Sequence, residues 1–306
     1  MRNNSFLFIV LQEIKNRFYI LLNFTLKNIL PPIRVNSWGG IGSQLFALNL
    51  MFDLSIKYPM RKILFLQHNG GVTKRENEIN FVKNTFYDTK FVKDYSIDSN
   101  FKKNKIEDNK RPDFKIKLKQ KIFTILVKIG FMATCNTDAE FSKLKPWICD
   151  IRGHYLIRKV TSQFMALLNK ELNLDNEIST GAIAIHYRLG DMVNLDKKFD
   201  SSSIRIINHV TEINNRFGAK KILLFSDSIS LAYANLNNHE FLQKVLKIEC
   251  YNLSTLESIK KCVLAEYFVG TESKVSLWIV NLRNFRNQQA TTYFDYFSDL
   301  VYKPIL

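Results

Sequence analysis

A histidine, an arginine and an aspartate follow a short apolar run in the middle of the chain. Residues 181–185 are rich in isoleucine, and His186, Arg188 and Asp191 come directly after them. Such a run predicts a buried strand, and in open α/β sheets ligands bind outside the carboxyl ends of the strands. An arginine there stays charged and presents a planar fork of donors that fits a phosphate. The pattern predicts an anion site, but a solvated turn with a local Arg–Asp ion pair fits the same residues.

Two later segments also place polar groups after predicted strands. Asp227 follows the apolar run 221–225, where its carboxylate would face a ligand or cap the next helix, and these two roles are compatible. A further predicted strand, 266–269, leads into a turn with small hydroxyl residues at the start of a helix, where free backbone N–H groups bind anions. The members of this turn are Gly270, Thr271, Ser273 and Ser276. The alternative for Ser276, and for Trp278 after it, is simple packing of the helix.

A glycine-rich loop follows the first predicted strand, residues 33–36. Gly39, Gly40 and Gly42 form a tight turn that lets the backbone approach a ligand, and a helix is predicted to begin near Ser43. Strand, glycine loop and helix are the start of a Rossmann-like unit. The spacing differs from G-x-G-x-x-G, so the loop does not predict a dinucleotide site.

Two of these segments resemble motifs of one enzyme family, in the family's order. Residues 186–191, His-Tyr-Arg-Leu-Gly-Asp, resemble the His-x-Arg-Arg-Gly-Asp motif of the α-1,2-fucosyltransferases, which is related to that of the α-1,6- and protein O-fucosyltransferases. Leu189 stands where the family has its second arginine, and Ser43 where it has an asparagine. The amino-terminal signature Gly-Gly-Leu-Gly-Asn-Gln-(Met/Leu)-Phe is matched by Gly39, Gly40, Gly42, Gln44 and Phe46.

The resemblance spans roughly residues 33–283 and implies a fold, a donor and a set of site residues. The implied fold is α/β, with two Rossmann-like domains facing a cleft, as in GT-B glycosyltransferases. In the family the first arginine, here Arg188, holds the diphosphate of GDP-fucose, and His186 and Asp191 would support it in catalysis. The implied donor-binding residues are Arg188, Asp227, Gly270, Thr271, Ser273 and Ser276. Those implied for the acceptor-side loop are Gly39, Gly40, Gly42 and Gln44.

A proline pair at 31–32 and a polar break at 175–180 divide the chain into three predicted parts. Residues 1–32 form an amphipathic amino-terminal segment, 33–178 an acceptor-side α/β domain, and 179–306 a nucleotide-sugar-binding α/β domain. Strands that alternate with helices in both halves favour parallel sheets.

Composition limits the class of protein and of partner. With 46% hydrophobic and 13% aromatic residues, the 306-residue chain is expected to fold into ordinary globular domains. Its net charge of +16 favours anionic partners such as nucleic acid, an anionic membrane face or phosphorylated substrates. The lysine-rich stretch 102–121 alternates with apolar residues like a strand at 114–119. It predicts a solvated face, or contact with anionic lipid head groups or a lipid-diphosphate acceptor. It lacks the aromatic interleaving of nucleic-acid sites, so no nucleic-acid partner is expected.

The amino-terminal segment has helical apolar spacing without the length of a membrane span. Leu7, Leu11, Ile14, Phe18 and Leu21 recur at helical spacing among basic residues, but no run approaches the roughly 18–20 apolar residues that a spanning helix needs. No small-residue cleavage site of a signal peptide follows. An interfacial helix on a membrane and a helix packed on the protein's own core both fit.

The residues and the resemblance together predict a cytoplasmic, inverting glycosyltransferase at the inner face of the cell membrane. It would move fucose from GDP-fucose to a hydroxyl of a surface oligosaccharide, of the O-antigen or capsule kind, on a lipid diphosphate carrier. No D-x-D motif or metal-ligand cluster occurs in the sequence, so no metal or other cofactor is expected, and the four cysteines are predicted to be reduced, buried or half-buried thiols. Another nucleotide-sugar donor, a basic nucleic-acid-binding protein and a membrane scaffold are the alternatives.

Overall fold

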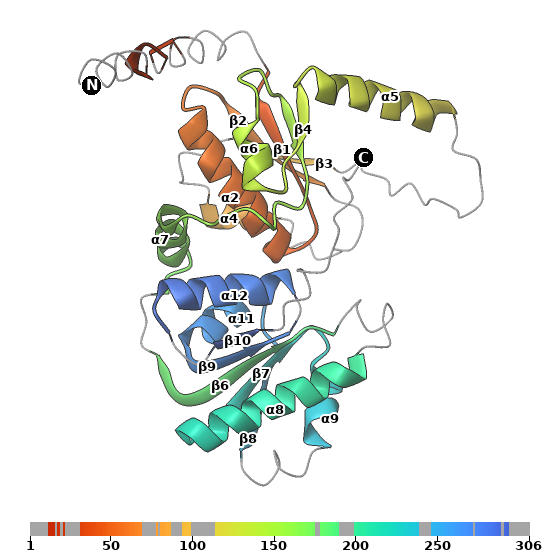
Figure 1. Ribbon diagram of the computed structural model, residues 1–306. Coiled ribbons are helices and arrows are strands. Elements are labelled where there is room, and N and C mark those ends of the chain that lie inside the picture. Colours follow the sequence, from red (N-terminus) through yellow and green to blue (C-terminus); the bar gives the residue numbers. More distant parts are fainter. Residues whose placement is uncertain are drawn as a thin grey trace, which may run out of the picture. The chain divides into compact units, whose positions relative to one another are not determined.

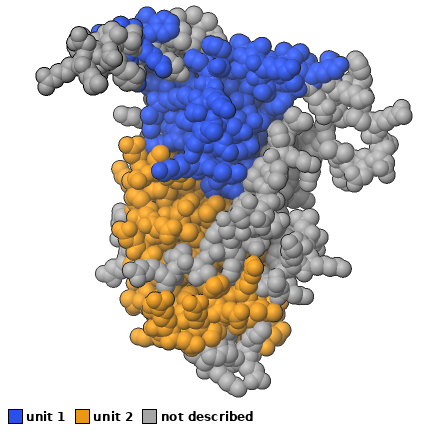
Figure 2. Space-filling model, in the orientation of Figure 1, with its two compact units in different colours: residues 1–159, 302–306 blue, residues 160–301 orange. Residues whose placement is uncertain are grey.

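The computed structural model describes residues 12–15, 17–18, 21, 31–68, 78, 80–86, 94–98, 114–174, 178–189, 199–238, 246–271, 273–288 and 291–293. The chain divides into two compact units, residues 1–159 with 302–306 and residues 160–301 (Figure 2). This division falls earlier than the predicted one at 178/179. The helix α7 (Ser162–Glu171) belongs to the second unit because it contacts α12 (Lys274–Phe285), where Phe164 meets Trp278 edge to face.

The first unit (Figure 1) is an α/β fold around a parallel sheet. The strand order of this sheet is β3-β2-β1-β5-β4. Its described strands are β1 (Ile33–Trp38), β2 (Ile63–His68), β3 (Asp94–Asp98), β4 (Met132–Thr134) and β5 (Asp150–Arg152). Its described helices are α2 (Ile41–Lys57), α4 (Phe81–Phe86), α5 (Phe114–Lys128) and α6 (Asp138–Ser142). The predicted succession of strand, glycine loop and helix is confirmed by β1 and α2, which begins two residues before Ser43.

The second unit is also α/β, with a parallel sheet in the order β10-β9-β6-β7-β8. Its described strands are β6 (Ser179–Tyr187), β7 (Lys221–Ser226), β8 (Lys247–Tyr251), β9 (Ala265–Gly270) and β10 (Thr291–Tyr293). Besides α7 and α12, its described helices are α8 (Phe199–Phe217), α9 (Ile229–Asn237) and α11 (Thr255–Leu264). Strands β7 and β8 follow on one side of β6, and strands β9 and β10 lie on its other side. This is a doubly wound order, in which the direction of strand addition reverses between β6 and β9. Ligands of open α/β sheets bind at such a switch point.

Side chains alternate between the two faces of β6, and each face packs against different helices in the core of the second unit. Ile183, Ile185 and Tyr187 join a buried apolar cluster with residues of α8 and α9, and α11 and α12 cover the opposite face of the sheet (Figure 1). Because side chains alternate along a strand, His186 faces α11 and α12. Each fully buried isoleucine contributes roughly 2–3 kcal/mol by leaving water.

The lysine-rich segment is helical where the structure describes it, so the strand-like interpretation of residues 114–119 is wrong. Residues 114–128 form α5, and the apolar spacing of Leu118, Ile122 and Ile125 continues at helical period beyond the alternating stretch. Six alternating residues are too few to outweigh that longer pattern. The lysines of the stretch before Arg111 lie outside the described residues.

The described residues between positions 12 and 21 are helical, and their apolar side chains face water. Ile14, Phe18 and Leu21 are 58%, 64% and 64% exposed, so they do not pack on the core. Leu7 and Leu11 lie outside the described residues. In the parts of the chain that the structure describes, no helix has the length and hydrophobicity to cross a bilayer.

Candidate functional site

The predicted ligand-binding residues of the second unit gather at one edge of its sheet. The strands β9, β6 and β7 are parallel neighbours, with His186 in register with Gly270 on one side and with Phe225 on the other. The carboxyl ends of neighbouring parallel strands meet at the same edge, so the residues after them come together at the switch point. Three segments that are 30 to 90 residues apart in the sequence therefore form one site.

Thr271 ties the end of β6 to the end of β9. Its backbone N–H donates to the carbonyl of His186 at 3.1 Å, and its hydroxyl donates to the same carbonyl at 3.0 Å. The hydroxyl also accepts from the backbone N–H of Arg188 at 2.8 Å. The backbone that carries Arg188 is thus held by a buried side chain of the predicted donor-binding turn.

An ion pair sets the position of the arginine. Arg188 Nη1 lies 2.9 Å from Asp227 Oδ2, and Asp227 Oδ1 accepts from the backbone N–H of Leu189 at 2.9 Å. The Asp227 side chain is 6% exposed and that of Arg188 30%, so a buried carboxylate holds a partly exposed guanidinium. Asp227 does not cap α9, whose N-cap residue is Ser228. This geometry orients a permanent positive charge at the sheet edge.

Hydroxyl groups hold the start of α12 against the face of β6 that carries His186. Ser273 caps the helix by accepting from the backbone N–H of Ser276 at 3.0 Å, and its hydroxyl donates to Ser276 Oγ at 3.1 Å. Ser276 Oγ lies 2.7 Å from His186 Nδ1. Trp278 is fully buried and packs in the helix, which is the alternative that the sequence left open for it.

Glycine is required at residue 270 by the closeness of its neighbours. A Cβ atom there would lie 2.7 Å from Phe268 Cε1 and 3.0 Å from Ser276 Cβ. Contacts this short force a shift of the aromatic ring or of the helix start. The absence of a side chain lets β9 pass directly under the turn that leads to α12.

Lys274 is a basic residue at this edge that the sequence did not single out. It is the first residue of α12, and burial lowers its pKa to about 8. Its place in the sequence between Ser273 and Ser276, two predicted ligands, is the signal that could have identified it.

The buried histidine makes the stability of the second unit dependent on pH. Burial, and then the positive charge of Arg188, lowers the pKa of His186 to about 4. The unfolded chain, with an ordinary pKa near 6.5, binds more protons between these values, so the free energy of unfolding falls as the pH drops from about 6.5 to 4. The full loss is about 3 kcal/mol. His186→Asn is expected to lack this component in urea unfolding measured at pH 7 and pH 4.5. Identical pH dependence in both proteins would contradict it.

The glycine loop of the first unit is held by buried amides. Gln44 is fully buried, and its Nε2 donates to the carbonyl of Gly39 at 3.5 Å and to that of Glu78. Gln67 Nε2 donates to the same Gly39 carbonyl at 3.3 Å. Gly39 has a φ of 95°, a conformation that favours glycine, and Gly40 is the N-cap residue of α2. The role of Gly39, Gly40, Gly42 and Gln44 on the acceptor side stays a prediction.

A polar chain that the sequence did not predict links the end of β2 to the interior of β1 and the start of β5. His68 Nε2 lies 2.7 Å from Asn36 Oδ1, and Asn36 Nδ2 donates to Asp150 Oδ1 at 3.1 Å. The His68 ring stacks on Trp38 with 4.5 Å between centroids. These residues come from β1, β2 and β5, whose adjacency no local pattern reveals.

The remaining predictions concern Asp191, a metal or cofactor, and the four cysteines. Asp191 lies outside the described residues. Within the described part of the chain, no group of three or more His, Cys, Asp or Glu side chains is placed to hold a metal ion, and the absence of a cofactor stays a prediction. Cys135 and Cys262 are buried and Cys149 is half-buried, as predicted, whereas Cys250 is exposed.

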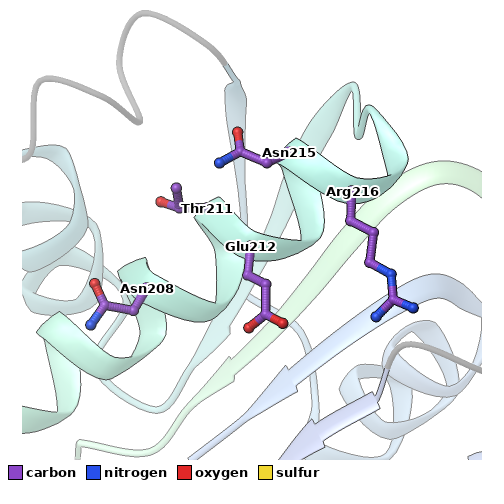
Figure 3. Close-up of a pocket in the computed structure, with 5 residues that line it drawn as sticks. All are labelled: Asn208, Thr211, Glu212, Asn215 and Arg216. Carbon is purple, nitrogen blue, oxygen red and sulfur yellow. The ribbon is translucent and has the colours of Figure 1, made fainter.

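An open pocket on α8 does not belong to this site. Figure 3 shows that the residues lining it project from successive turns of the one helix. They are Asn208, Thr211, Glu212, Asn215 and Arg216, and none is a predicted site residue.

Comparison with known proteins leaves the family open. No protein-family model and no curated protein sequence matches the chain. Solved structures of POFUT1 are similar in part. The crystal form III complex with GDP is 16% identical over 44% of this chain, which spans about half of that chain (47%), with a TM-score of 0.29. A high-resolution complex with GDP is 11% identical over 86% of this chain and 98% of that one, with a TM-score of 0.39. Likeness at this level establishes neither family nor activity, so the functional assignment rests on the chain's own residues.

Proposed function

We propose that this protein is a GT-B-type glycosyltransferase that takes fucose from GDP-fucose. The observation that carries the proposal is the convergence at one switch point of the three segments that resemble donor-side motifs of the fucosyltransferases. These segments contribute Arg188, Asp227 and the turn from Gly270 to Ser276. The two α/β units, each built around a parallel sheet, are compatible with the GT-B architecture.

The donor diphosphate would lie against the carboxyl edge of the second sheet. Arg188 supplies the fork of donors for the phosphate oxygens, and the start of α12 adds backbone N–H groups and the ammonium of Lys274. Asp227 keeps the guanidinium at the edge through the 2.9 Å ion pair. These groups are preorganised by the hydrogen bonds of Thr271, so little rearrangement is needed when the ligand binds.

The reaction would be a single displacement at the anomeric carbon. An acceptor hydroxyl oxygen forms the new bond to that carbon while the bond to the diphosphate oxygen breaks, and GDP leaves with the bonding electron pair. The hydroxyl proton passes to a general base. Arg188 stabilises the negative charge that develops on the departing diphosphate, where such electrostatic contributions reach about 3–4 kcal/mol.

His186 is better suited to positioning than to proton transfer. Its ring is buried, its Nδ1 is engaged by Ser276, and its pKa is far below neutrality. A group with these properties is a weak base at pH 7. We assign it the role of fixing the start of α12 relative to the strand that carries Arg188.

The acceptor and the cellular site complete the proposal. We infer a hydroxyl of a surface oligosaccharide on a lipid diphosphate carrier, handled at the cytoplasmic face of the membrane by an inverting, metal-independent enzyme. Gly39, Gly40, Gly42 and Gln44 would shape the acceptor side. The net charge of +16 supports an anionic lipid-linked acceptor.

Nucleotide selectivity tests the function. GDP and GDP-fucose are expected to bind and to raise the unfolding temperature, because a ligand at 100 times its Kd stabilises the folded state by about 2.7 kcal/mol. UDP, dTDP, CMP and their sugar adducts should do so weakly or not at all. Thermal unfolding and isothermal titration calorimetry of the full chain measure both effects.

The panel separates the components of the proposal. Selective binding of another nucleotide would contradict the fucose donor and keep a transferase. If none of the nucleotides binds, the glycosyltransferase function itself is wrong.

A further inference from the structure

One side of α5 exposes a continuous apolar stripe to water. Leu118, Ile122, Ile125 and Ile129 follow each other at intervals of four, three and four residues, which places them on one helical face. They are 47%, 48%, 57% and 50% exposed. Scattered apolar side chains on a surface are ordinary, but a contiguous row of this kind marks an interaction site.

The opposite side and the end of the helix are fixed to the first unit, so the stripe has a defined direction. α5 contacts β4, and Arg152 of β5 lies over the ring of Phe123, with 5.5 Å from guanidinium carbon to ring centroid. The helix ends in a Schellman motif, in which Gly130 N–H donates to Val127 O and Phe131 N–H to Leu126 O, both at 3.0 Å. Phe123 and Leu126 are half-buried, whereas the four residues of the stripe are exposed, so the stripe points away from the contacts with the first unit.

The carboxyl end of the stripe carries an aromatic anchor. Trp147 is 38% exposed, and its indole N–H donates to the carbonyl of Ile129 at 2.9 Å. Phe131, also 38% exposed, follows the helix end. Tryptophan is enriched where proteins meet the head-group level of a bilayer, since its ring is apolar and its N–H is polar.

Basic side chains border the stripe. Lys121 and Lys128 are exposed and lie on the same edge of it by helical spacing, and Lys145 is exposed beside the helix end, next to Gly130. Within α5 and the turn after it, residues 114–131, no acidic residue occurs. Lysine beside an apolar stripe can reach anionic head groups while the stripe enters the acyl boundary.

We propose that this face of α5, with Trp147 at its end, docks the protein on an anionic lipid bilayer. The lysines select the anionic surface, and the four aliphatic residues supply the apolar area that enters it. The exposed side chains of Ile14, Phe18 and Leu21, which also lie in the first unit beside basic residues, fit the same kind of surface. The proposal uses residues remote in sequence from the nucleotide site and does not depend on the transferase activity.

Vesicle binding by the full chain tests the proposal. The protein is expected to co-sediment with phosphatidylcholine vesicles that contain phosphatidylglycerol, and to bind pure phosphatidylcholine at least about tenfold more weakly. Ile125→Glu/Ile129→Glu should weaken binding to the anionic vesicles by about tenfold or more, and Lys121→Gln/Lys128→Gln should reduce it as well. Trp emission should shift to shorter wavelength on binding, and Trp147→Phe should remove that shift.

A matched variant guards against a general effect of added charge. Ile56→Glu/Ile157→Glu replaces two isoleucines of the first unit that are 59% and 55% exposed outside the stripe, and it should bind vesicles like the unchanged protein. The isoleucine and lysine variants should keep the unfolding temperature and GDP affinity of the unchanged protein, because these side chains are exposed. Failure to bind anionic vesicles, equal binding to neutral ones, or equal losses in both double variants would overturn the proposal. So would a dimer that only Ile125→Glu/Ile129→Glu dissociates in sedimentation velocity, since a second copy would then cover the stripe.

Discussion

Arg188→Ala is expected to lower the turnover of fucose transfer at least about 100-fold while the protein stays folded. The guanidinium is the permanent charge that the fold directs to the sheet edge, and removing one preorganised donor from such a site costs roughly 3–4 kcal/mol of transition-state stabilisation. Its own side chain is 30% exposed, but its loss leaves the 6%-exposed carboxylate of Asp227 without a cation, so the folded state should lose about 1–3 kcal/mol. Turnover with GDP-fucose measures the loss of transition-state stabilisation, and calorimetric affinity for GDP measures the loss of diphosphate binding.

Three variants make this result interpretable. Arg188→Lys keeps the charge and loses the planar fork, so it should recover part of the affinity and little of the turnover. Asp227→Asn keeps the arginine and removes its carboxylate partner, so it should impair positioning without removing the charge. Arg216→Ala removes an exposed arginine of α8 and should behave like the unchanged protein. A folded Arg188→Ala protein with near-normal turnover would rule out the assigned role.

Much of the second unit could be predicted from its apolar runs. The predicted strands around residues 181–185, 221–225 and 266–269 are β6, β7 and β9, because short isoleucine-, leucine- and valine-rich runs can be buried on both faces only in a covered parallel sheet. The order of the strands could not be predicted. That order depends on which runs pair across 30 to 90 residues, and no local pattern contains it.

Leu189 illustrates what a motif alone does not reveal. The family motif has a second arginine at this position, and the sequence could only register its loss. In the structure the leucine is 1% exposed and belongs to the same apolar cluster as Tyr187, on the side of the sheet that α8 covers. Alternation along the chain explains this, since His186 and Arg188 share one parity and Tyr187 and Leu189 the other. An arginine at position 189 would have to place its charge in the core. A second cation at this edge of the sheet therefore has to come from another segment, and Lys274 at the start of α12 is such a residue.

The glycine loop of the first unit is a case in which the local structure could be predicted and the long-range contacts could not. Its strand and helix were predictable from local pattern, but the buried contacts of Gln44 with Gly39 and Glu78 were not. Glu78 lies 34 residues further along the chain. The matched glutamine position is thus occupied by a side chain that supports the loop from inside, and this leaves the loop backbone as the part that can approach a ligand.

The largest effect on stability is expected at Arg283. Its side chain is fully buried in α12, and its guanidinium donates to four backbone carbonyls where α11 passes directly into β9. Nη1 lies 3.2 Å from the carbonyl oxygens of Cys262 and Val263 and also donates to Ala265, and Nη2 lies 2.8 Å from that of Glu266. The arginine takes the place of a helix C-cap, since no loop separates helix from strand.

Arg283→Met should lower the free energy of unfolding of the second unit by about 3–5 kcal/mol, because it leaves buried carbonyls without donors. Arg283→Lys should recover less than half, since an ammonium group cannot form the planar fork. Arg216→Met, at an exposed site, is the matched control. Urea unfolding followed by fluorescence in a Trp38→Phe/Trp147→Phe background, where the buried Trp278 is the remaining tryptophan, measures the change in this unit. Because β9 leads directly to Gly270 and Thr271, the same loss should weaken GDP binding, and an Arg283→Met protein within about 1 kcal/mol of the unchanged one would contradict the capping role.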